Sequence, residues 1–257
     1  MLRIATWNVN SLRVRLAQVI DWLNQKQPDV LALQEIKLTD DVFPLEALQE
    51  IGYHAVFAGQ KTYNGVALLS RTPATDVITD FPTLDDPQRR ILGASFGEVR
   101  VLNLYVPNGS EVDSEKYTYK LNWLQHLYQH VKTECEQYSK FVIVGDFNIA
   151  PDDRDVHDPA AWQGKILVSP VEREALQKIL DLGFCDSFRL FEQAAGHFSW
   201  WDYRAAAFRR NRGVRIDLIL ASQALKARCI SCQTDIEPRK LERPSDHAPV
   251  MAEFDLS

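Results

Sequence analysis

Hydrophobic positions follow two different spacings along the whole chain. Short apolar runs, with few interruptions, predict buried strands, and they occur at residues 2–7, 29–35, 65–70, 91–106, 140–148 and 215–222, with a last short run at 250–254. The long run at 91–106 predicts a hairpin that turns near Gly97 and Glu98. Strands therefore extend from one end of the sequence to the other.

Helical spacing occurs between these runs. Residues 116–135 place one apolar face on a predicted helix, and a shorter stretch near the start has the same spacing at Leu12, Leu16, Val19, Ile20 and Leu23. Ser169 and Glu172 have the spacing of a capping box, with Pro170 at the first helical position and Gly183 as the stop. Alternating strands and helices predict an α/β (α+β) fold of layered sheet with helices outside.

Composition and charge narrow the class of protein. A chain of 257 residues with 46% hydrophobic content can form one domain with a full core. It has no apolar run of eighteen residues and no signal-peptide start, so we expect a cytoplasmic protein without a membrane partner. The four cysteines indicate reduced thiols, and the CxxC at Cys229 and Cys232 lacks further zinc ligands nearby. Net charge is -6, so a nucleic-acid partner would need a local basic patch.

Polar residues follow four predicted strands at the point where each ends. They are Asn8 and Asn10, Gln34 and Glu35, Tyr105 and Asn108, and Asp146 and Asn148. These side chains converge if the strands enter the same rim of a sheet, where ligands bind in sheet proteins. The alternative is turn chemistry, because Asn and Asp side chains bond the backbone at strand ends. Glu35 is a poor turn residue, and the fourfold repetition favours a site.

The stretch "ERPSDHAPV" at 242–250 places an acid beside a histidine just before the last predicted strand. Neighbouring side chains on a strand point to opposite faces, so Asp246 and His247 are expected to have different partners. Asp217 lies inside an apolar strand, and a buried carboxylate needs a partner. His247 is one candidate and Arg215 is the other. A single SDH tripeptide would more often be a turn cap beside an ordinary histidine.

Nine segments in order resemble the exonuclease III family of apurinic/apyrimidinic (AP) endonucleases, within the endonuclease/exonuclease/phosphatase superfamily. They are "TWNVNSL", "PDVLALQE", "GQKTYNGVALLS", "DPQRRI", "NLYVPNG", "VGDFNIAP", "FSWWDYR", "RIDLIL" and "ERPSDHAPV". The resemblance covers the chain from end to end. It implies one catalytic domain over 1–257, folded as a four-layer α/β sandwich of two packed, mainly antiparallel sheets flanked by helices. It also implies phosphodiester hydrolysis with Mg²⁺, for which Mn²⁺ can substitute.

The resemblance also implies roles for the rim residues. Glu35 would be the principal metal ligand, assisted by Asn8 and Asp246, since Mg²⁺ prefers oxygen ligands. Asp217 would orient His247, and either His247 or Asp146 would be the base that activates water. Contacts to phosphate oxygens would come from Tyr105, Asn148, Asn10 and Asn108. In-line attack by water would then leave a 3′-hydroxyl and a 5′-phosphate.

Recognition of DNA is expected from a separate stretch. Five arginines and no acid fall between residues 204 and 216, interleaved with Phe208, and they are Arg204, Arg209, Arg210, Arg212 and Arg215. This pattern favours a loop that grips a DNA backbone over an ordinary solvated face. Arg89, Arg90 and Lys61 are weaker phosphate candidates.

By resemblance, Trp200, Val214 and Ile216 would line an apolar pocket for a base-free sugar flipped from duplex DNA. For Trp200 and Trp201, ordinary core packing is the alternative. Val214 is smaller than the tryptophan that some members of this family carry there. The balance between abasic-site cleavage, 3′-end trimming and 3′-phosphate removal is therefore left open.

The expected partner is double-stranded DNA with abasic sites or damaged or recessed 3′ ends, bound by a monomer. Two other classes of protein compete with this interpretation. One is a phosphatase or phospholipase of the same superfamily that acts on a soluble or lipid phosphoester, and the arginine stretch counts against it. The other is a catalytically silent DNA-binding module, which the filled polar positions disfavour.

Overall fold

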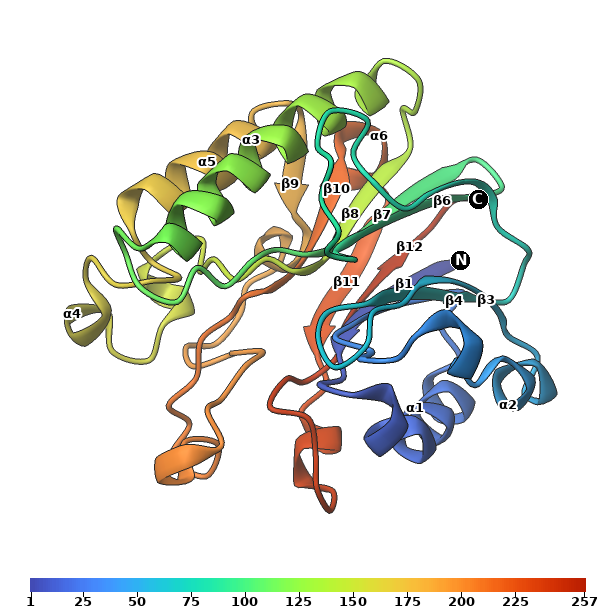
Figure 1. Ribbon diagram of the computed structural model, residues 1–257, viewed down its shortest axis with the longest axis horizontal. Helices are drawn as coiled ribbons and strands as arrows, with labels where there is room; N and C mark the ends of the chain where they lie inside the picture. The colour runs from blue at the N-terminus through green and yellow to red at the C-terminus, as the bar shows by residue number, and fades with distance from the viewer.

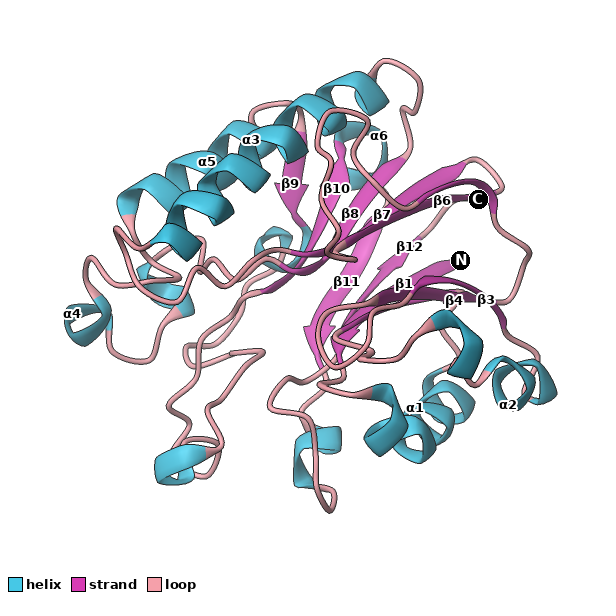
Figure 2. Ribbon diagram, in the orientation of Figure 1, coloured by secondary structure: helices cyan, strands magenta, loops and turns pink.

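Two six-stranded sheets form the centre of the molecule in the computed structural model, which describes residues 1–257 (Figures 1 and 2). The first sheet has the order β11-β12-β1-β2-β4-β3, from β1 (Leu2–Asn8), β2 (Val30–Gln34), β3 (His54–Ala58), β4 (Val66–Ser70), β11 (Cys229–Thr234) and β12 (Val250–Phe254). The second has the order β5-β6-β7-β8-β10-β9, from β5 (Thr75–Ile78), β6 (Ile91–Phe96), β7 (Val99–Tyr105), β8 (Phe141–Asp146), β9 (Phe184–Asp186) and β10 (Asp217–Ser222). Only β1–β2 and β7–β8 pair in parallel, so the prediction of mainly antiparallel sheets is confirmed.

Helices cover the outer faces of both sheets (Figure 2). The helices of the chain are α1 (Leu12–Lys26), α2 (Leu45–Glu50), α3 (Glu115–Cys135), α4 (Pro159–Trp162), α5 (Pro170–Leu180) and α6 (Gln223–Lys226), and α4 lies away from both sheets. Five short 3-10 helices lie in the connections, at Asp40–Val42, Asp153–Asp155, Ser187–Leu190, Arg204–Ala206 and Glu237–Lys240. In Figure 1, α1 and α2 lie below the first sheet, and α3 and α5 lie above the second.

Three apolar layers hold this arrangement together. The inner layer combines residues of both sheets, such as Ile4 and Val66 from the first and Val101 and Ile219 from the second. A second layer packs α3 and α5 on the outer face of the second sheet, and a third packs α1 on the first. The predicted four-layer sandwich is therefore confirmed.

Local predictions also agree with the structure. The hairpin turns between Phe96 and Val99. Ser169 Oγ accepts a hydrogen bond from the Glu172 amide at 3.3 Å, and the Glu172 carboxylate accepts one from the Ser169 amide at 3.1 Å, which completes the capping box. The short strands β3, β5, β9 and β11 were not predicted, because each is an edge strand of its sheet and carries few buried residues. The CxxC motif lies on β11, and its thiols are free.

The ends of the central strands form one rim of the sandwich. β1 and β2 run parallel, as do β7 and β8, so four strands that carry predicted site residues finish at this end. Both chain termini lie at the other end of the sheets (Figure 1). None of the helices combines the length and the apolar character that a membrane crossing requires.

Candidate active site

Strand register brings the predicted residues of the second sheet into one row. Tyr105 is paired with Asp146 across β7 and β8, and Asp146 is paired with Asp217 across β8 and β10. The Asn8 amide joins the two sheets, because its Nδ2 donates to Glu35 Oε1 at 2.8 Å and to Asp146 Oδ2 at 3.0 Å. Strand ends far apart in the sequence therefore meet at one point.

Three residues of this rim have a left-handed backbone. The φ angles are 43° for Asn10, 51° for Glu35 and 48° for Asn148. Asn adopts this conformation readily, whereas for Glu it costs on the order of 1 kcal/mol. Glu35 is thus held in a strained position by the turn after β2.

His247 and Asp217 form a buried pair. His247 Nδ1 lies 2.9 Å from Asp217 Oδ2, and its Nε2 lies 3.7 Å from Asp146 Oδ2. Burial opposes protonation of the imidazole, but the carboxylates of Asp217 and Asp146 outweigh it and raise the pKa of His247 to about 10. The expected Asp217–His247 contact is confirmed.

Asp246 points to partners other than those of His247, as its position beside His247 predicted. Its carboxylate accepts hydrogen bonds from Asn10 Nδ2 and Trp200 Nε1, each at 3.0 Å. A hydrogen bond from Ser245 Oγ to the Asn8 carbonyl at 2.7 Å ties this segment to the end of β1. The two neighbouring side chains therefore serve two different parts of the rim.

The carboxylates of Asp146 and Glu35 differ in their surroundings. Burial raises the pKa of Asp146 to about 7, although His247 opposes the rise. Burial acts in the same direction on Glu35, yet Lys37 Nζ at 2.9 Å and the Asn8 amide bring the pKa of that carboxyl below its ordinary value. Lys37 also donates to Asn10 Oδ1 at 2.6 Å. The sequence offered no signal for Lys37, because it is one of many surface-type lysines.

The residues that were expected to contact phosphate oxygens make further contacts at the rim. Asn108 Nδ2 donates to Asn148 Oδ1 at 2.9 Å, and Asn148 Nδ2 donates to the Val106 carbonyl at 2.9 Å. The Arg90 guanidinium lies over the ring of Tyr105, 4.6 Å from its centroid. Burial, together with the nearby charge of Glu35, raises the pKa of Tyr105 well above its ordinary value, so the phenol keeps its proton.

Glu35, Asp146 and His247 present ligand atoms that all lie within 4.8 Å of one another. The donor set suits a hard divalent cation, since two carboxylates supply oxygen ligands and the region is largely buried. Asp246 is not part of this group. Asn8 directs its Nδ2 at the carboxylates, and its Oδ1 accepts from the Asn10 amide at 3.0 Å. Metal ligation by Asn8 or Asp246 stays a prediction.

The arginine stretch divides into two kinds of residue. Arg209, Arg210 and Arg212 are exposed and have no ion pair. Arg204 is also exposed, and it pairs with Asp202 at 2.6 Å. Arg215 is different, because it is buried between Asp155 and Asp186, each at 2.6 Å. The expectation that Arg215 joins a DNA-gripping loop was therefore wrong, and so was its candidacy as the partner of Asp217.

The predicted sugar pocket is only partly accessible. Trp200 is half-buried, and its backbone forms an isolated antiparallel β-bridge with that of His247. Val214 has no exposed surface and Ile216 has 2%, because both pack in an apolar cluster beneath Trp200. These two residues can shape a pocket from below, but they offer almost no surface to a ligand. Trp201 is a core residue, in agreement with the alternative stated for the tryptophan pair.

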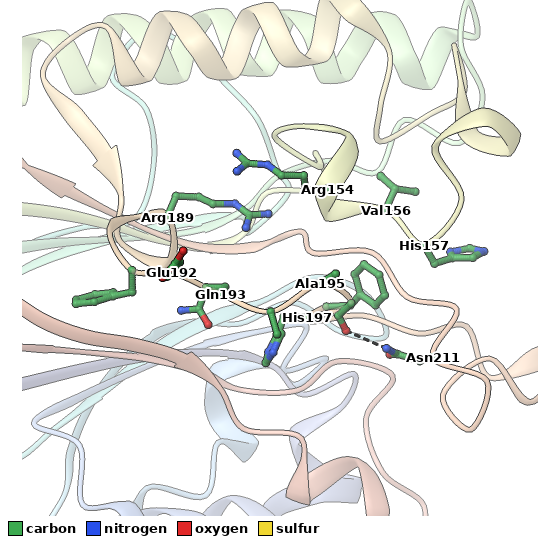
Figure 3. Close-up of a pocket in the computed structure, with 13 residues that line it drawn as sticks. Arg154, Val156, His157, Arg189, Glu192, Gln193, Ala195, His197 and Asn211 are labelled. Atoms are coloured by element: carbon green, nitrogen blue, oxygen red, sulfur yellow. Dashed lines mark hydrogen bonds between the residues drawn. The ribbon is translucent and has the colours of Figure 1, made fainter.

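A cavity of about 590 Å³ is lined by a different set of residues (Figure 3). None of the predicted catalytic or metal-binding residues lines it. Its lining includes Arg154, His157, Arg189, His197 and Asn211. The His157 amide donates to the Gly213 carbonyl at 3.1 Å, so the cavity borders the segment that follows the exposed arginines.

The model of the endonuclease/exonuclease/phosphatase family matches residues 5–247. Exodeoxyribonuclease III of Haemophilus influenzae is 39% identical, over 98% of this chain and 100% of the relative. A structure of the 3′ phosphatase NExo from Neisseria, bound to a product DNA hairpin, is 50% identical with a TM-score of 0.98, over 99% of this chain and 100% of that chain. An AP endonuclease from Archaeoglobus fulgidus is 42% identical with a TM-score of 0.96, over all of both chains.

This fold, with carboxylates, amides and an oriented imidazole at one rim of two packed sheets, defines a hydrolase. The chain belongs to the endonuclease/exonuclease/phosphatase family, and its similarity to the exodeoxyribonucleases extends over nearly its full length.

Proposed function

We propose that this protein is a DNA-repair phosphodiesterase that uses Mg²⁺ and acts on duplex DNA as a monomer in the cytoplasm, with residues 1–257 as one catalytic domain. It would cleave 5′ to abasic sites, remove 3′-terminal nucleotides or blocking groups, or both, and leave a 3′-hydroxyl. One observation carries the proposal, namely that Glu35, Asp146 and His247 converge within 4.8 Å at the rim of the sandwich. Similarity to an exodeoxyribonuclease III, a 3′ phosphatase and an AP endonuclease supports it.

The electrostatics of the site favour one assignment of roles. His247 is held as a cation by Asp217, so it suits binding of a phosphate oxygen better than proton abstraction. Asp146 has a pKa raised to about 7 and is therefore the better general base for water. Glu35 stays ionised and would hold the metal ion, with the Asp146 carboxylate beside it. The ion would supply positive charge against the phosphate as charge develops.

The remaining rim residues would bind and orient the substrate. Asn148 and Asn108 face one another and would contact phosphate oxygens, with Asn10 on the opposite side of the site. Tyr105 keeps its proton and can donate a hydrogen bond. Arg209, Arg210 and Arg212 would neutralise phosphates of the duplex, because they are exposed and unpaired. Trp200 would contact the sugar.

One assay tests this proposal. The substrate is a duplex that carries an abasic analogue, a recessed 3′ end and a 3′-phosphate, with a separate label that reports on each of the three. It is incubated with Mg²⁺, with Mn²⁺ or with EDTA. We expect cleavage only with a divalent ion, and we expect it to be lost in Glu35→Ala and His247→Ala variants that keep the wild-type melting profile. Glu134→Ala serves as a control far from the rim. Hydrolysis of an inositol phosphate with no turnover of any DNA arm would contradict the proposal.

A further inference from the structure

A buried ion pair contacts the backbone of Asn108 and Asn148, the two asparagines proposed to contact phosphate. Lys120 in α3 and Glu172 in α5 are both fully buried, and the ammonium and carboxylate are in hydrogen-bond contact. Removing two charges from water is costly, and apolar residues of similar size often stabilise a fold as well or better. Such a pair is therefore weak evidence for stability, and its other contacts are the better guide to its role.

The other two donors of Lys120 go to the loops of the site. Its Nζ donates to the Asn148 carbonyl at 2.7 Å and to the Asn108 carbonyl at 3.1 Å. These two residues also bond each other through their side chains, at 2.9 Å. One ammonium thus fixes the peptide groups of both asparagines, which follow two different strands.

Glu172 fixes the ammonium in turn. Its Oε2 accepts from the Ser169 amide at 3.1 Å and its Oε1 from the Leu167 amide at 3.2 Å. Neither charged group has a spare direction in which to move, because all three ammonium protons and both carboxylate oxygens are engaged. Burial lowers the pKa of Lys120, although Glu172 opposes this effect.

The connection continues to the proposed base. The backbone N–H of Asn148 donates to Asp146 Oδ1 at 2.9 Å, so the backbone of Asn148 bonds Lys120 through its carbonyl and Asp146 through its N–H. Asn148 is in the left-handed region, with φ at 48°. A residue held in this conformation needs surrounding contacts that fix it, and Lys120 supplies one of them.

We propose that Lys120 is a positioning residue for the phosphodiesterase reaction, and that it acts through the peptide carbonyls of Asn108 and Asn148. The ammonium is fully buried and all of its donors are used within the protein, so it would act only through other residues. It sets the direction of both side-chain amides toward the phosphate and of the Asn148 amide toward Asp146. This inference rests on the proposed function, because it needs a reaction whose rate depends on these residues.

Lys120→Met is the principal test variant, and Arg100→Met is its matched control. Arg100 forms a buried two-point ion pair with Glu134, at 2.7 and 2.8 Å, at the other end of α3. Both changes leave a buried carboxylate unpaired, so both lower the melting temperature. Activity is measured on the duplex substrates at least 15 °C below each variant's own melting temperature. We expect Lys120→Met to lower kcat about 30-fold with KM changed less than about threefold, since displacement of catalytic groups by an ångström can cost about 100-fold. We expect Arg100→Met to lower kcat by less than about twofold.

Two further measurements separate positioning from general structure. In an Asn148→Ala background, Lys120→Met should lower kcat by only about threefold or less, because the side-chain amide of Asn148, through which Lys120 mainly acts, is gone. Lys120→Arg keeps the charge pair and serves where Lys120→Met does not fold, and we expect it to lower kcat at least about fivefold, since a planar guanidinium cannot reproduce the three ammonium directions. The proposal is overturned if Lys120→Met, or Lys120→Arg in its place, loses no more kcat than Arg100→Met, or if the loss is undiminished in the Asn148→Ala background. Inactive wild-type protein would instead count against the proposed function.

Discussion

Replacement of Asp217 by asparagine tests the electrostatic design of the site. Asp217 is 1% exposed, and one oxygen of its carboxylate accepts from His247 Nδ1 at 2.9 Å. The other oxygen is buried without a partner, so an asparagine fits the same space. The substitution removes the charge that contributes most to holding His247 protonated, and it leaves the imidazole in place.

The size of the effect follows from the histidine. A rise in pKa from 6.5 to about 10 corresponds to roughly 5 kcal/mol between the two protonation states. Without the charge of Asp217, only Asp146 and Asp246 are left to oppose the effect of burial, and we expect the pKa of His247 to fall back toward its ordinary value of 6.5. At pH 8 the variant would then hold a neutral imidazole. We expect kcat to fall by about 10² to 10³, the range seen when one charge-stabilising group is removed.

Two measurements check this expectation. Nitrogen NMR of the imidazole reports the titration of His247 directly, and initial rates between pH 5.5 and 9 report activity. In the variant, lowering the pH restores the cation on His247 but also protonates Asp146, whose pKa is raised to about 7, so we expect the activity lost at pH 8 not to recover at lower pH. The raised pKa of His247 also stabilises the wild-type fold fully below about pH 6.5, and this contribution is lost as the pH rises through about 10. The melting temperature of wild type should therefore exceed that of the Asp217→Asn variant by more at pH 6 than at pH 9.

Glu134→Gln is the control for loss of a buried carboxylate away from the rim. We expect it to lower the melting temperature without changing the pH profile. An Asp217→Asn variant whose kcat at pH 8 stays within about threefold of wild type would contradict the role assigned to the Asp217 carboxylate. An unchanged titration of His247 would refute it equally.

Three further predictions concern separate parts of the molecule. Glu35→Gln should weaken Mn²⁺ binding at least about tenfold in paramagnetic titrations without DNA, because it removes a carboxylate from the cluster; unchanged affinity would place the ion elsewhere. Arg209, Arg210 and Arg212 are the three unpaired arginines of the 204–216 stretch. Replacing all three by alanine should reduce the slope of log K for DNA binding against log salt concentration by about 2 to 3. An unchanged slope would show that they do not contact DNA. Asp235 accepts from Trp22 Nε1 at 3.0 Å and from Lys26 at 2.9 Å, and these contacts lower its pKa despite burial. Asp235→Asn should therefore lower the free energy of unfolding at pH 7 by about 1 kcal/mol, with the difference lost as the pH falls below about 4, and a difference that persists at pH 3 would contradict this.

The sequence by itself determined which strands carry the site and where on each strand the polar residues lie. Apolar runs predicted the ends of β1, β7 and β8 at Asn8, Tyr105 and Asp146, and Glu35 follows directly after β2, because a continuous buried run is a local property of the chain. A partner for Asp217 was also predictable, since a carboxylate inside an apolar strand requires one, but the sequence left His247 and Arg215 as two candidates and the structure selects His247. Motif resemblance supplied the family and the four layers.

Only the tertiary structure decided how the remaining charges are used. Arg215 belongs to a run of arginines in the sequence, yet Asp155 and Asp186 neutralise it inside the protein. Val214 lies beneath Trp200 rather than at a surface, and Lys120 reaches two loops from the middle of a helix. These outcomes depend on which distant segments pack together. A pattern within one segment records whether its residues are suited to burial, and it carries no information on the charge or shape of the segment that will cover them.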